Sequence, residues 1–305
     1  MAEVPRLSII VPHLNAAGAL HRCLAALAEQ CADRSDVEVI VVDNGSETKP
    51  ISVCDLYDFV RLAEEPEPGP GPARSHGAHL AAARLLAFID SDCIAAPGWI
   101  DGIIGYFGTH PETGVIGGDV RIHLADAARI TSIEAYESVY GYRMQLYIER
   151  DHYAATCNMA VRRRVFDTVG DFAGIAIAED VDWGRRATAL DVQIDYVPEI
   201  QIATPARVNF QELTRKWDRH ISHEFAELRG KADHMRWFVR ALAIAVSPFA
   251  ELGRIARSAR ISGVRSRGLA LFCLVRIRLY RARRMLDLLR RGDGAGLSSV
   301  WRRRS

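Results

Sequence analysis

The sequence lacks the cysteine patterns that mark disulfide-stapled and zinc-binding proteins. Its six cysteines are spread along 305 residues, with no CxxC pair and no regular spacing. A chain of this length can bury a core large enough to fold without covalent cross-links. We therefore expect reduced thiols and a cytoplasmic protein.

Long apolar runs are missing as well. Two apolar stretches, residues 241–250 and 269–275, fall short of the roughly 20 residues that a membrane-spanning helix needs. The first residues, MAEVPRLSIIVPHLN, show no basic segment followed by a long apolar one, so we expect no signal peptide. No GxGxxG pattern follows the first apolar run, which disfavours a dinucleotide-dependent dehydrogenase. No nucleic-acid recognition module is visible, and we expect no nucleic-acid partner.

Short apolar runs alternate with helical patterns along the front of the chain. The apolar runs lie at 7–11, 37–42, 85–89, 114–122 and 192–198, and the helical patterns at 17–30, 73–84 and 98–107. Continuous hydrophobicity means that both faces of a strand are covered, as in a parallel sheet between helices. The sequence therefore predicts an α/β fold with a doubly wound, mostly parallel sheet.

Polar residues follow three of these strands at their carboxyl ends. His13 and Asn15 come after the first strand, Asp43 after the second, and Asp90 and Asp92 after a later one. In an open α/β sheet, ligands bind outside the carboxyl ends of the strands. Three strands that deliver polar side chains to one edge therefore predict a binding site there.

The motif Asp90-Ser91-Asp92 places two carboxylates close together at the end of a buried strand. Their repulsion favours a hard divalent cation beside them, and oxygen ligands suit Mg²⁺ or Mn²⁺. The alternative is an ordinary surface turn, because Asp and Ser are common turn residues. The position in line with Asp43 favours the functional interpretation.

Three acidic residues, Glu179, Asp180 and Asp182, gather at an expected helix start in AIAEDVDWGRRA. The helix dipole stabilises acidic residues in a first turn, which would explain one or two of them without chemistry. The functional interpretation is a general base, a carboxylate that takes a proton from an attacking hydroxyl.

Five segments in this order resemble family 2 inverting glycosyltransferases of the GT-A fold. They are IIVPHLNAAGALHRCLAAL, VEVIVVDNGS, GPARSHGAHLAAARLLAFIDSDC, CNMAVRRRVFDTVGDF and AEDVDWGRRA. The resemblance implies a GT-A nucleotide-sugar glycosyltransferase domain at residues 1–234, Rossmann-like and flanked by helices. Residues 235–305 would form a C-terminal helical extension.

The resemblance also implies roles for individual residues. A nucleotide-diphosphate sugar donor would be held by Pro12, His13, Asn15, Asp43, Arg74, Asp90 and Ser91. Asp92 would hold the metal, Mn²⁺ or Mg²⁺. Asp180 would be the catalytic base, with Glu179 supporting it or contacting the acceptor.

The implied reaction is a direct displacement with inversion onto a glycan or lipid-linked acceptor, in cell-surface polysaccharide or glycolipid synthesis. The metal would neutralise charge on the departing diphosphate, and holding both substrates in place would supply much of the rate. The alternative is a catalytically silent nucleotide-binding subunit of a polysaccharide assembly complex. The intact Asp90-Ser91-Asp92 and Glu179-Asp180 motifs argue against it.

The end of the chain is strongly basic. Residues 235–305 hold 17 arginines, no lysine and three acidic residues, a net charge of +14, so the preceding residues carry −13. Apolar residues recur there at three- and four-residue steps: Phe272, Val275, Leu279, Ala282, Leu286 and Leu289. We expect an amphipathic helix on an anionic membrane surface, at the inner face of the cell membrane. The alternative is a helix packed on the catalytic domain or on a second subunit.

A tyrosine-rich segment at 130–150 leaves two interpretations open. It is either a helix whose aromatic side chains pack against the sheet, or a wall that binds the acceptor. Tyrosine suits the second role because its ring stacks on sugars and its hydroxyl forms hydrogen bonds.

Overall fold

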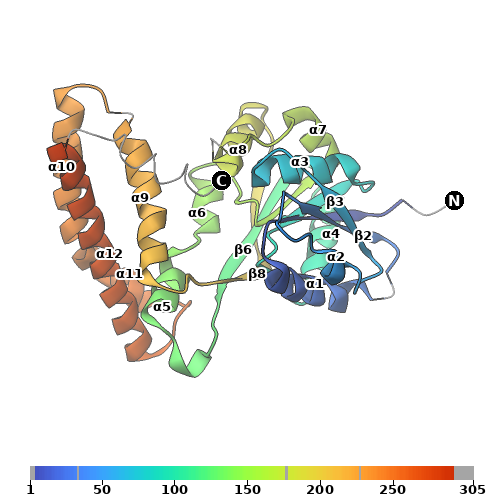
Figure 1. Cartoon of the computed structure of the whole chain (residues 1–305), viewed down its shortest axis with the longest axis horizontal. Helices are drawn as coiled ribbons and strands as arrows, with labels where there is room; N and C mark the ends of the chain where they lie inside the picture. The colour runs from blue at the N-terminus through green and yellow to red at the C-terminus, as the bar shows by residue number, and fades with distance from the viewer. Residues whose placement is uncertain (1–3, 33, 176–177, 227, 292–305) are drawn as a thin grey trace. The chain divides into compact units, whose positions relative to one another are not determined.

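The computed structural model describes residues 4–32, 34–175, 178–226 and 228–291. The chain divides into two units, coloured along the chain in Figure 1. The first unit comprises residues 1–121 and 143–205, and the second comprises residues 122–142 and 206–305. The second unit thus combines a segment from the middle of the chain with the residues from 206 onward, and it includes the extension that the sequence predicts from residue 235.

The first unit is built on an eight-stranded sheet with the strand order β3-β2-β1-β4-β7-β6-β8-β5. Four neighbouring strands run parallel, namely β1 (Leu7–His13), β2 (Val37–Asp43), β3 (Val60–Glu64) and β4 (Leu85–Ile89). Three of them are the continuous apolar runs that predicted buried strands. Their carboxyl ends lie at one edge of the sheet.

Beyond β4 the sheet becomes mixed. The strand β7 (Asn158–Arg162) pairs antiparallel with both β4 and β6 (Val115–His123). The short β5 (Ile94–Ala95) pairs antiparallel with β8 (Ile194–Pro205). The predicted α/β class is confirmed, and the parallel arrangement belongs to the first four strands.

Helices flank this sheet (Figure 1): α1 (Ala17–Cys31), α2 (Ile51–Cys54), α3 (Pro70–Leu80), α4 (Trp99–Thr109), α6 (Met144–Glu149), α7 (Arg163–Val169) and α8 (Glu179–Ala189). The helix predicted at 73–84 begins at Pro70, because proline suits a first helical turn. It lies directly on the parallel strands at Gly77, where a Cβ would meet Ile10 Cγ2 at 2.5 Å and Val42 Cγ2 at 3.0 Å. This close approach fixes the helix that carries Arg74.

The second unit consists of helices: η1 (Ala127–Arg129), α5 (Ser132–Tyr140), α9 (Phe210–Ala226), α10 (Lys231–Val246), η2 (Ser247–Glu251), α11 (Leu252–Arg257) and α12 (Gly263–Arg291). The long α12 packs against α5, α9 and α10. Two apolar clusters form its core, one around Tyr136 and Leu274 and the other around Trp237 and Met285. Among the described helices, none combines the length and the hydrophobicity needed to cross a bilayer.

The buried face of α12 differs from the stripe predicted from the sequence. Its core side consists of Ala270, Cys273, Leu274, Ile277, Ala282, Met285 and Leu288, whereas the predicted stripe residues Phe272 and Leu279 are more than half exposed. Arg281 also lies on the buried side, with its guanidinium 3.5 Å from the centre of the Trp217 ring, and burial lowers its pKa to about 10. The helix is therefore a core element of the second unit, packed on that unit's own helices.

Candidate functional site

A buried arginine joins the two acidic motifs. Arg74, in α3, is 3% exposed and donates from Nη2 to Asp90 Oδ1 at 2.5 Å and from Nη1 to Glu179 Oε1 at 2.8 Å. Burial alone would lower the pKa of Arg74, but the two carboxylates raise it above its usual value. One guanidinium thus links the end of β4 to the start of α8.

The carboxylates after β4 lie close enough to share a cation. Ligand atoms of Asp90, Asp92 and Cys93 all lie within 4.8 Å of one another. Partial burial and the neighbouring Asp90 carboxylate raise the pKa of Asp92. The Cys93 thiol donates to Asp92 Oδ1 at 3.6 Å, and burial raises its own pKa well above the usual range. Cys93 therefore stays protonated, and the carboxylate oxygens are the ligands on offer.

These donors fit a hard divalent cation better than zinc. Mg²⁺ and Mn²⁺ prefer carboxylate oxygens and complete their shells with water and phosphate oxygens, whereas zinc favours thiolate and imidazole. Asp90 engages Arg74 through Oδ1, which leaves its second oxygen for another ligand. Desolvation and, after it, repulsion from Asp90 raise the pKa of Asp92, and a bound cation would relieve the repulsion.

The three acidic residues at the start of α8 have separate partners. Glu179 is held by Arg74, and Asp182 forms a salt bridge with Arg186 four residues on, at 2.9 Å. Asp180 accepts a hydrogen bond from the backbone N–H of Val181 at 2.8 Å. Burial and the adjacent Glu179 raise the pKa of Asp180. A carboxylate with a raised pKa holds a proton more readily, as a general base requires.

Two tyrosines lie beside Asp180. The rings of Tyr147, in α6, and Tyr153, after it, stack with their centroids 5.2 Å apart. Burial raises the pKa of both phenols, and the Asp180 carboxylate adds to the shift. Helix α8 packs directly on Tyr153 at Gly184, where a Cβ would meet Tyr153 Cβ at 2.3 Å. No sequence motif pointed to Tyr153, which lies just past the tyrosine-rich segment.

The tyrosine-rich segment divides between the two units, and its first part packs against helices of the second unit and not against the sheet as expected. Tyr136 and Tyr140, on α5, stack on each other at 5.2 Å and pack in the core of the second unit. Tyr147 belongs to the first unit and lies near Asp180. Packing therefore explains the first part of the segment, and a position beside the candidate base describes the second.

The ends of β1 and β2 leave buried polar atoms without partners. His13 pairs in register with Asp43, and both side chains are 2% exposed. Within the described part of the chain, both ring nitrogens of His13 and Oδ1 of Asp43 lack a hydrogen-bond partner. Burial lowers the pKa of His13, although the nearby Asp43 opposes the shift. Buried polar atoms are almost always hydrogen-bonded, so these orphaned atoms mark a place for a polar ligand.

The loops after β1 and β2 hold each other in place. Asn15 adopts a left-handed backbone conformation with φ of 51°, which asparagine tolerates better than most residues. Its N–H donates to Ser46 Oγ at 2.8 Å, and the N–H of Glu47 donates to Asn15 Oδ1 at 2.9 Å. Pro12 is half-buried at the end of β1. These hydrogen bonds hold the two loops in a fixed conformation beside His13 and Asp43.

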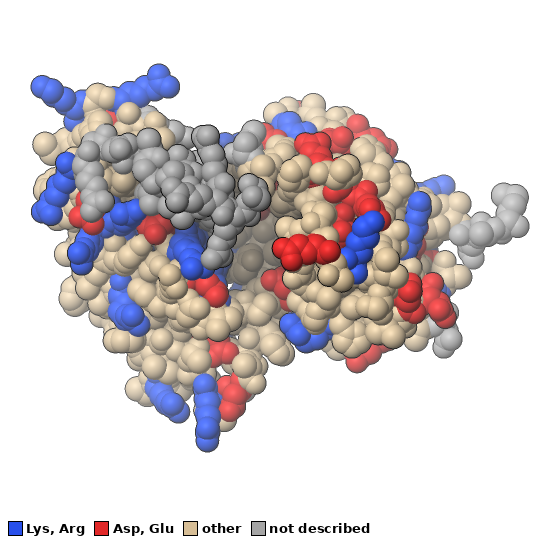
Figure 2. All heavy atoms as spheres, viewed as in Figure 1, with Lys and Arg blue, Asp and Glu red and all other residues tan. Residues whose placement is uncertain are grey.

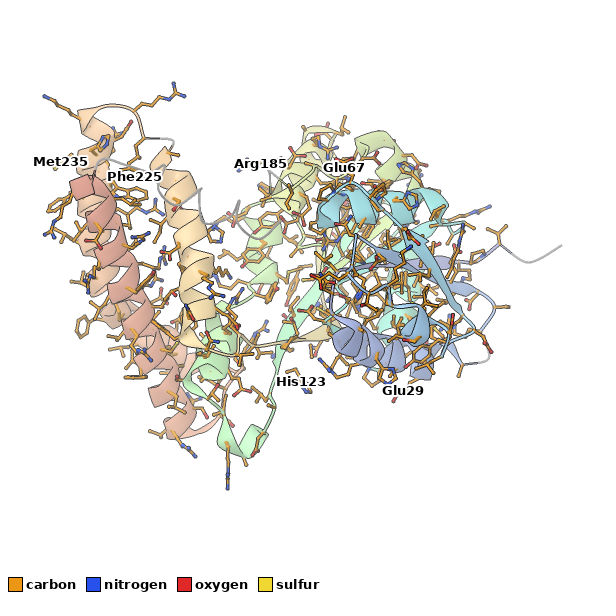
Figure 3. All side chains as sticks on the ribbon, in the orientation of Figure 1. Glu29, Glu67, His123, Arg185, Phe225 and Met235 are labelled. Carbon is orange, nitrogen blue, oxygen red and sulfur yellow. The ribbon has the colours of Figure 1, made fainter. Side chains whose placement is uncertain are left out.

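The loop before α3 is fixed by a side chain that follows Asp43. Asn44 donates from Nδ2 to the carbonyl oxygens of Glu65 and Glu67, at 2.9 and 2.7 Å (Glu67 is labelled in Figure 3). Its Oδ1 accepts from the N–H of Gly69 at 2.7 Å. Asn44 was not among the site residues expected from the sequence.

The predicted site residues of the first four strands thus meet at one edge of the sheet. Pro12, His13 and Asp43 end β1 and β2, while Asp90, the half-buried Ser91 and the exposed Asp92 follow β4. Arg74 connects Asp90 to Glu179, and Asp180 is the next residue. The arrangement brings a polar sheet edge, a pair of carboxylates that could hold a cation and a candidate base into one unit.

A cavity of about 1000 Å³ lies at the opposite edge of the same sheet, near Arg6, Leu85 and Arg162. Two of the five arginines in its lining, Arg162 and Arg163, donate to backbone carbonyls. This cavity is separate from the acidic site at the carboxyl edge.

Known proteins with similar sequences are glycosyltransferases. The family described as Glycosyl transferase family 2 matches residues 8–170. Glycosyltransferase AglE of Haloferax volcanii is 33% identical over 222 residues, which cover 70% of this chain and 71% of that protein. Validoxylamine A glucosyltransferase of Streptomyces hygroscopicus is 35% identical over 122 residues, which cover 38% of this chain and 29% of that enzyme.

Solved structures share the fold at low sequence identity. The mannosyltransferase PcManGT from Pyrobaculum calidifontis, in complex with GDP-Man and Mn²⁺, aligns with a TM-score of 0.57 at 17% identity, over 99% of this chain and 88% of that one. TarS of S. aureus, in complex with UDP-GlcNAc, aligns with a TM-score of 0.54 at 16% identity, over 94% and 92% of the two chains. The predicted GT-A fold is therefore confirmed.

Proposed function

Because the chain belongs to glycosyl transferase family 2, we propose that this glycosyltransferase moves a sugar from a nucleotide-diphosphate donor to a hydroxyl acceptor with inversion. The observation that carries the proposal is the position of Arg74 between Asp90 and Glu179. This arginine draws the two acidic motifs together, so that the carboxylates expected to hold the metal for the leaving group and the base expected to take the acceptor's proton would belong to one site.

The donor would occupy the edge formed by β1, β2 and β4. The orphaned polar atoms of His13 and Asp43 support a role in holding the base and ribose, with Pro12 and Asn15 shaping the same corner. Asp90 and Ser91 would face the ribose and diphosphate. The two solved structures hold GDP-Man and UDP-GlcNAc, which supports a nucleotide-diphosphate sugar as donor.

Arg74 itself takes a different role from the one implied by the resemblance. It is buried, with two terminal nitrogens occupied by carboxylates, so we assign it to positioning Asp90 and Glu179 and not to direct contact with the nucleotide.

A divalent cation, Mn²⁺ or Mg²⁺, would be held by Asp92 with Asp90. When bound, it supplies charge neutralisation for the departing diphosphate. The short spacing of these carboxylates and the raised pKa of Asp92 support this assignment, as does the Mn²⁺ in PcManGT.

Asp180 would act as the base. It takes the proton of the acceptor hydroxyl while that oxygen bonds to the anomeric carbon, and the bond from this carbon to the phosphate oxygen breaks. A single displacement inverts the configuration at this carbon. Glu179, held by Arg74, fixes the start of α8 and with it the position of Asp180.

The acceptor would lie on the Asp180 side, against Tyr147 and Tyr153. Stacked aromatic rings beside a base suit a sugar ring or an isoprenoid phosphate-linked sugar, so we propose a glycan or lipid-linked acceptor. The corresponding role is cell-surface polysaccharide or glycolipid synthesis by an enzyme peripheral to the cytoplasmic face of the membrane.

The test replaces Asp180 with Asn and measures sugar transfer and donor binding. We expect transfer to fall by about 10² to 10⁴, the usual contribution of a general base, with donor binding retained. The matched control is Asp182→Asn, which removes an acid from the same helical turn and breaks only the partly exposed salt bridge with Arg186. Equal transfer by the Asp180→Asn variant and the native protein would refute the base assignment.

A further inference from the structure

One face of the second unit carries large apolar side chains in solvent. Seven side chains on α10, η2 and α11 are between 42% and 78% exposed: Met235, Phe238, Val239, Leu242, Val246, Phe249 and Leu252. We refer to this set as the α10 apolar face. Single exposed apolar residues are ordinary, but seven within 18 residues of three consecutive helices indicate an interaction surface.

The helix α10 has two distinct apolar faces. Trp237, Ala241 and Ile244 are buried in the cluster that also contains Phe225 of α9 and Met285 of α12. The α10 members of the apolar face recur at three- and four-residue steps and span an arc of about 100°. Figure 3 labels one residue of each kind, the buried Phe225 and the exposed Met235. Core packing therefore accounts for only one of the two faces.

The surroundings of the α10 apolar face are basic. Five arginines lie between residues 235 and 260, and Glu251 is the only acidic residue in that stretch. Three of these arginines have acidic partners: Arg236 pairs with Asp233 at 3.6 Å, Arg240 with Glu224 at 2.6 Å, and Arg254 with Glu251 at 2.9 Å. The side chain of Arg236 is nevertheless 83% exposed, and Arg257 and Arg260 leave this stretch with a net positive charge. Figure 2 shows arginine and lysine side chains over much of the visible surface of this unit. The face thus combines apolar side chains with a positive rim.

We propose that the α10 apolar face lies on an anionic lipid bilayer, with α10 parallel to the membrane surface. Its large side chains would enter the boundary between headgroups and acyl chains, and the flanking arginines would meet lipid phosphates. Helix α10 has 16 residues, about 24 Å in length, which suits lying on a bilayer and not crossing it.

The positive charge around the α10 apolar face favours contact with an anionic bilayer over contact with a second copy of the chain. A symmetric dimer through this surface would bring two positive rims together, and like charges at an interface are unfavourable. An anionic membrane instead complements both the apolar side chains and the rim. The inference deepens the membrane location proposed above and rests on it, but it moves the contact from the α12 stripe to α10.

The stripe on α12 is less suited to this role. Arg276 lies over the rings of Phe272 and Phe210, with its guanidinium 5.5 and 4.1 Å from their centres. Phe272, the one aromatic residue of that stripe, is therefore covered in part by the guanidinium of Arg276. Phe249, by contrast, is 78% exposed at the turn between α10 and α11.

The experiment is sedimentation of the full chain with vesicles of phosphatidylcholine, with and without phosphatidylglycerol. The test variant combines Phe238→Gln, Leu242→Gln and Phe249→Gln. The control combines Ile51→Gln, Leu56→Gln and Leu190→Gln, which are 51% to 64% exposed on the first unit. We expect binding to anionic vesicles that weakens with salt, a loss of about tenfold or more in the test variant, and no change in the control.

Two results would overturn the inference. One is failure of the native chain to bind anionic vesicles, and the other is unchanged binding by a folded test variant. A native dimer that the test variant converts to monomer, with vesicle binding unchanged, would assign the face to self-association. If the triple variant does not fold, Leu242→Trp in the native chain replaces it. Its fluorescence should shift to the blue with anionic vesicles, unlike that of Leu190→Trp, and equal responses would refute the contact.

Donor binding separates this inference from the proposed function. We expect UDP or GDP with Mn²⁺ to stabilise the native chain and the test variant equally against heat. Loss of vesicle binding with nucleotide binding intact would be the expected result for the membrane face. Vesicle binding without any nucleotide binding would contradict the proposed function and leave the membrane inference standing.

Discussion

The guanidinium of Arg74 donates to the carboxylate of Glu179 at 2.8 Å, across 105 positions of sequence. The same guanidinium binds Asp90 at 2.5 Å. Arg74 therefore positions both the acidic motif after β4 and the start of α8, the helix that carries Asp180. Both motifs were visible in the sequence, but their coupling follows only from the packing of α3 on the parallel strands.

Replacing Arg74 with Met should destabilise the protein and lower its activity together. The carboxylates of Asp90 and Glu179 would lose the guanidinium that pairs with them, which should lower the free energy of unfolding by about 2 to 4 kcal/mol. This is below the cost for a fully buried pair, because the Asp90 side chain is 34% exposed. Urea unfolding and donor turnover measure the two effects. The control is Arg34→Met, an arginine that also bridges two aspartates, Asp36 and Asp101.

Because Asp101 is largely exposed, the Arg34→Met control should cost less than about 1 kcal/mol. Similar losses of stability in both variants, or normal turnover by the Arg74→Met protein, would argue against a positioning role.

Removing the charge of Asp180 or Asp92 should stabilise the fold while it damages function. Both carboxyl groups have pKa values raised above the ordinary 3.8, so the folded state binds their protons more tightly than the unfolded state. The free energy of unfolding therefore falls as the pH rises from 3.8 through the raised pKa, and the full penalty remains at neutral pH. Asp180→Asn and Asp92→Asn should raise Tm at pH 7 in EDTA, and a lower Tm would contradict this account.

The same shift predicts the acid limb of the pH profile. A base whose pKa lies above 3.8 is protonated at a higher pH than an ordinary aspartate, so sugar transfer should begin to fall at a pH clearly above that value. Turnover measured across pH at saturating donor and Mn²⁺ gives the midpoint. A midpoint at or below 3.8 would exclude Asp180 as the titrating base.

Metal binding should depend on Asp92. Mn²⁺ with UDP or GDP is expected to raise the Tm of the native chain, and EDTA should reverse the effect. Asp92→Asn should lose most of this metal-dependent increase. The control Asp101→Asn removes a carboxylate from the first unit that lies against Arg34. An unchanged response in the Asp92→Asn protein would refute the assignment.

The contact between α3 and the sheet should be intolerant of a single methyl group. Gly77→Ala would place a Cβ at 2.5 Å from Ile10 Cγ2, which should cost about 1 to 3 kcal/mol and shift Arg74. Gly105→Ala, in α4, is the matched control, because nothing lies within 4 Å of its new Cβ. That control should be neutral or stabilising by up to about 1 kcal/mol, since alanine favours helix. Thermal unfolding compares the two.

The paired tyrosines should affect the acceptor more than the donor. Tyr147→Ala or Tyr153→Ala removes a stacked ring beside Asp180, and we expect the acceptor KM to rise about tenfold. The donor KM should change little. Tyr57→Ala is the control, since Tyr57 lies against His21 and Phe59 away from Asp180. Equal changes in both KM values would point to a structural role for the pair.

The first part of the fold could be predicted because β1, β2 and β4 are continuous buried apolar runs. The strand β3 was missed, since its segment VRLAE is only partly buried and carries charges. The strand β7 was missed because its five residues begin with the polar Asn158 and end with Arg162, the first of three consecutive arginines. Local patterns also could not show that the sheet turns antiparallel beyond β4.

The acidic site residues could be predicted from their motifs, whereas the partners that shape them could not. Arg74, Glu179 and Tyr153 meet through tertiary packing and have no common local signal. On α12, residues at three- and four-residue steps form more than one apolar stripe. Periodicity identified the helix but not which stripe is buried, because the answer depends on the positions of α5, α9 and α10.

The segment that contains α5 has a consequence for how the chain is made. Ile133, Tyr136 and Val139 leave the ribosome well before the partners that cover them, Leu274 and Ile277 of α12. During synthesis the apolar side of α5 stays incompletely covered until α12 is made, although Leu213 and Ile255 of the same cluster emerge earlier. The last described helix, α12, therefore completes a core that begins with α5 near the middle of the sequence. Removing α12 would expose the apolar side of α5 to solvent and favour aggregation.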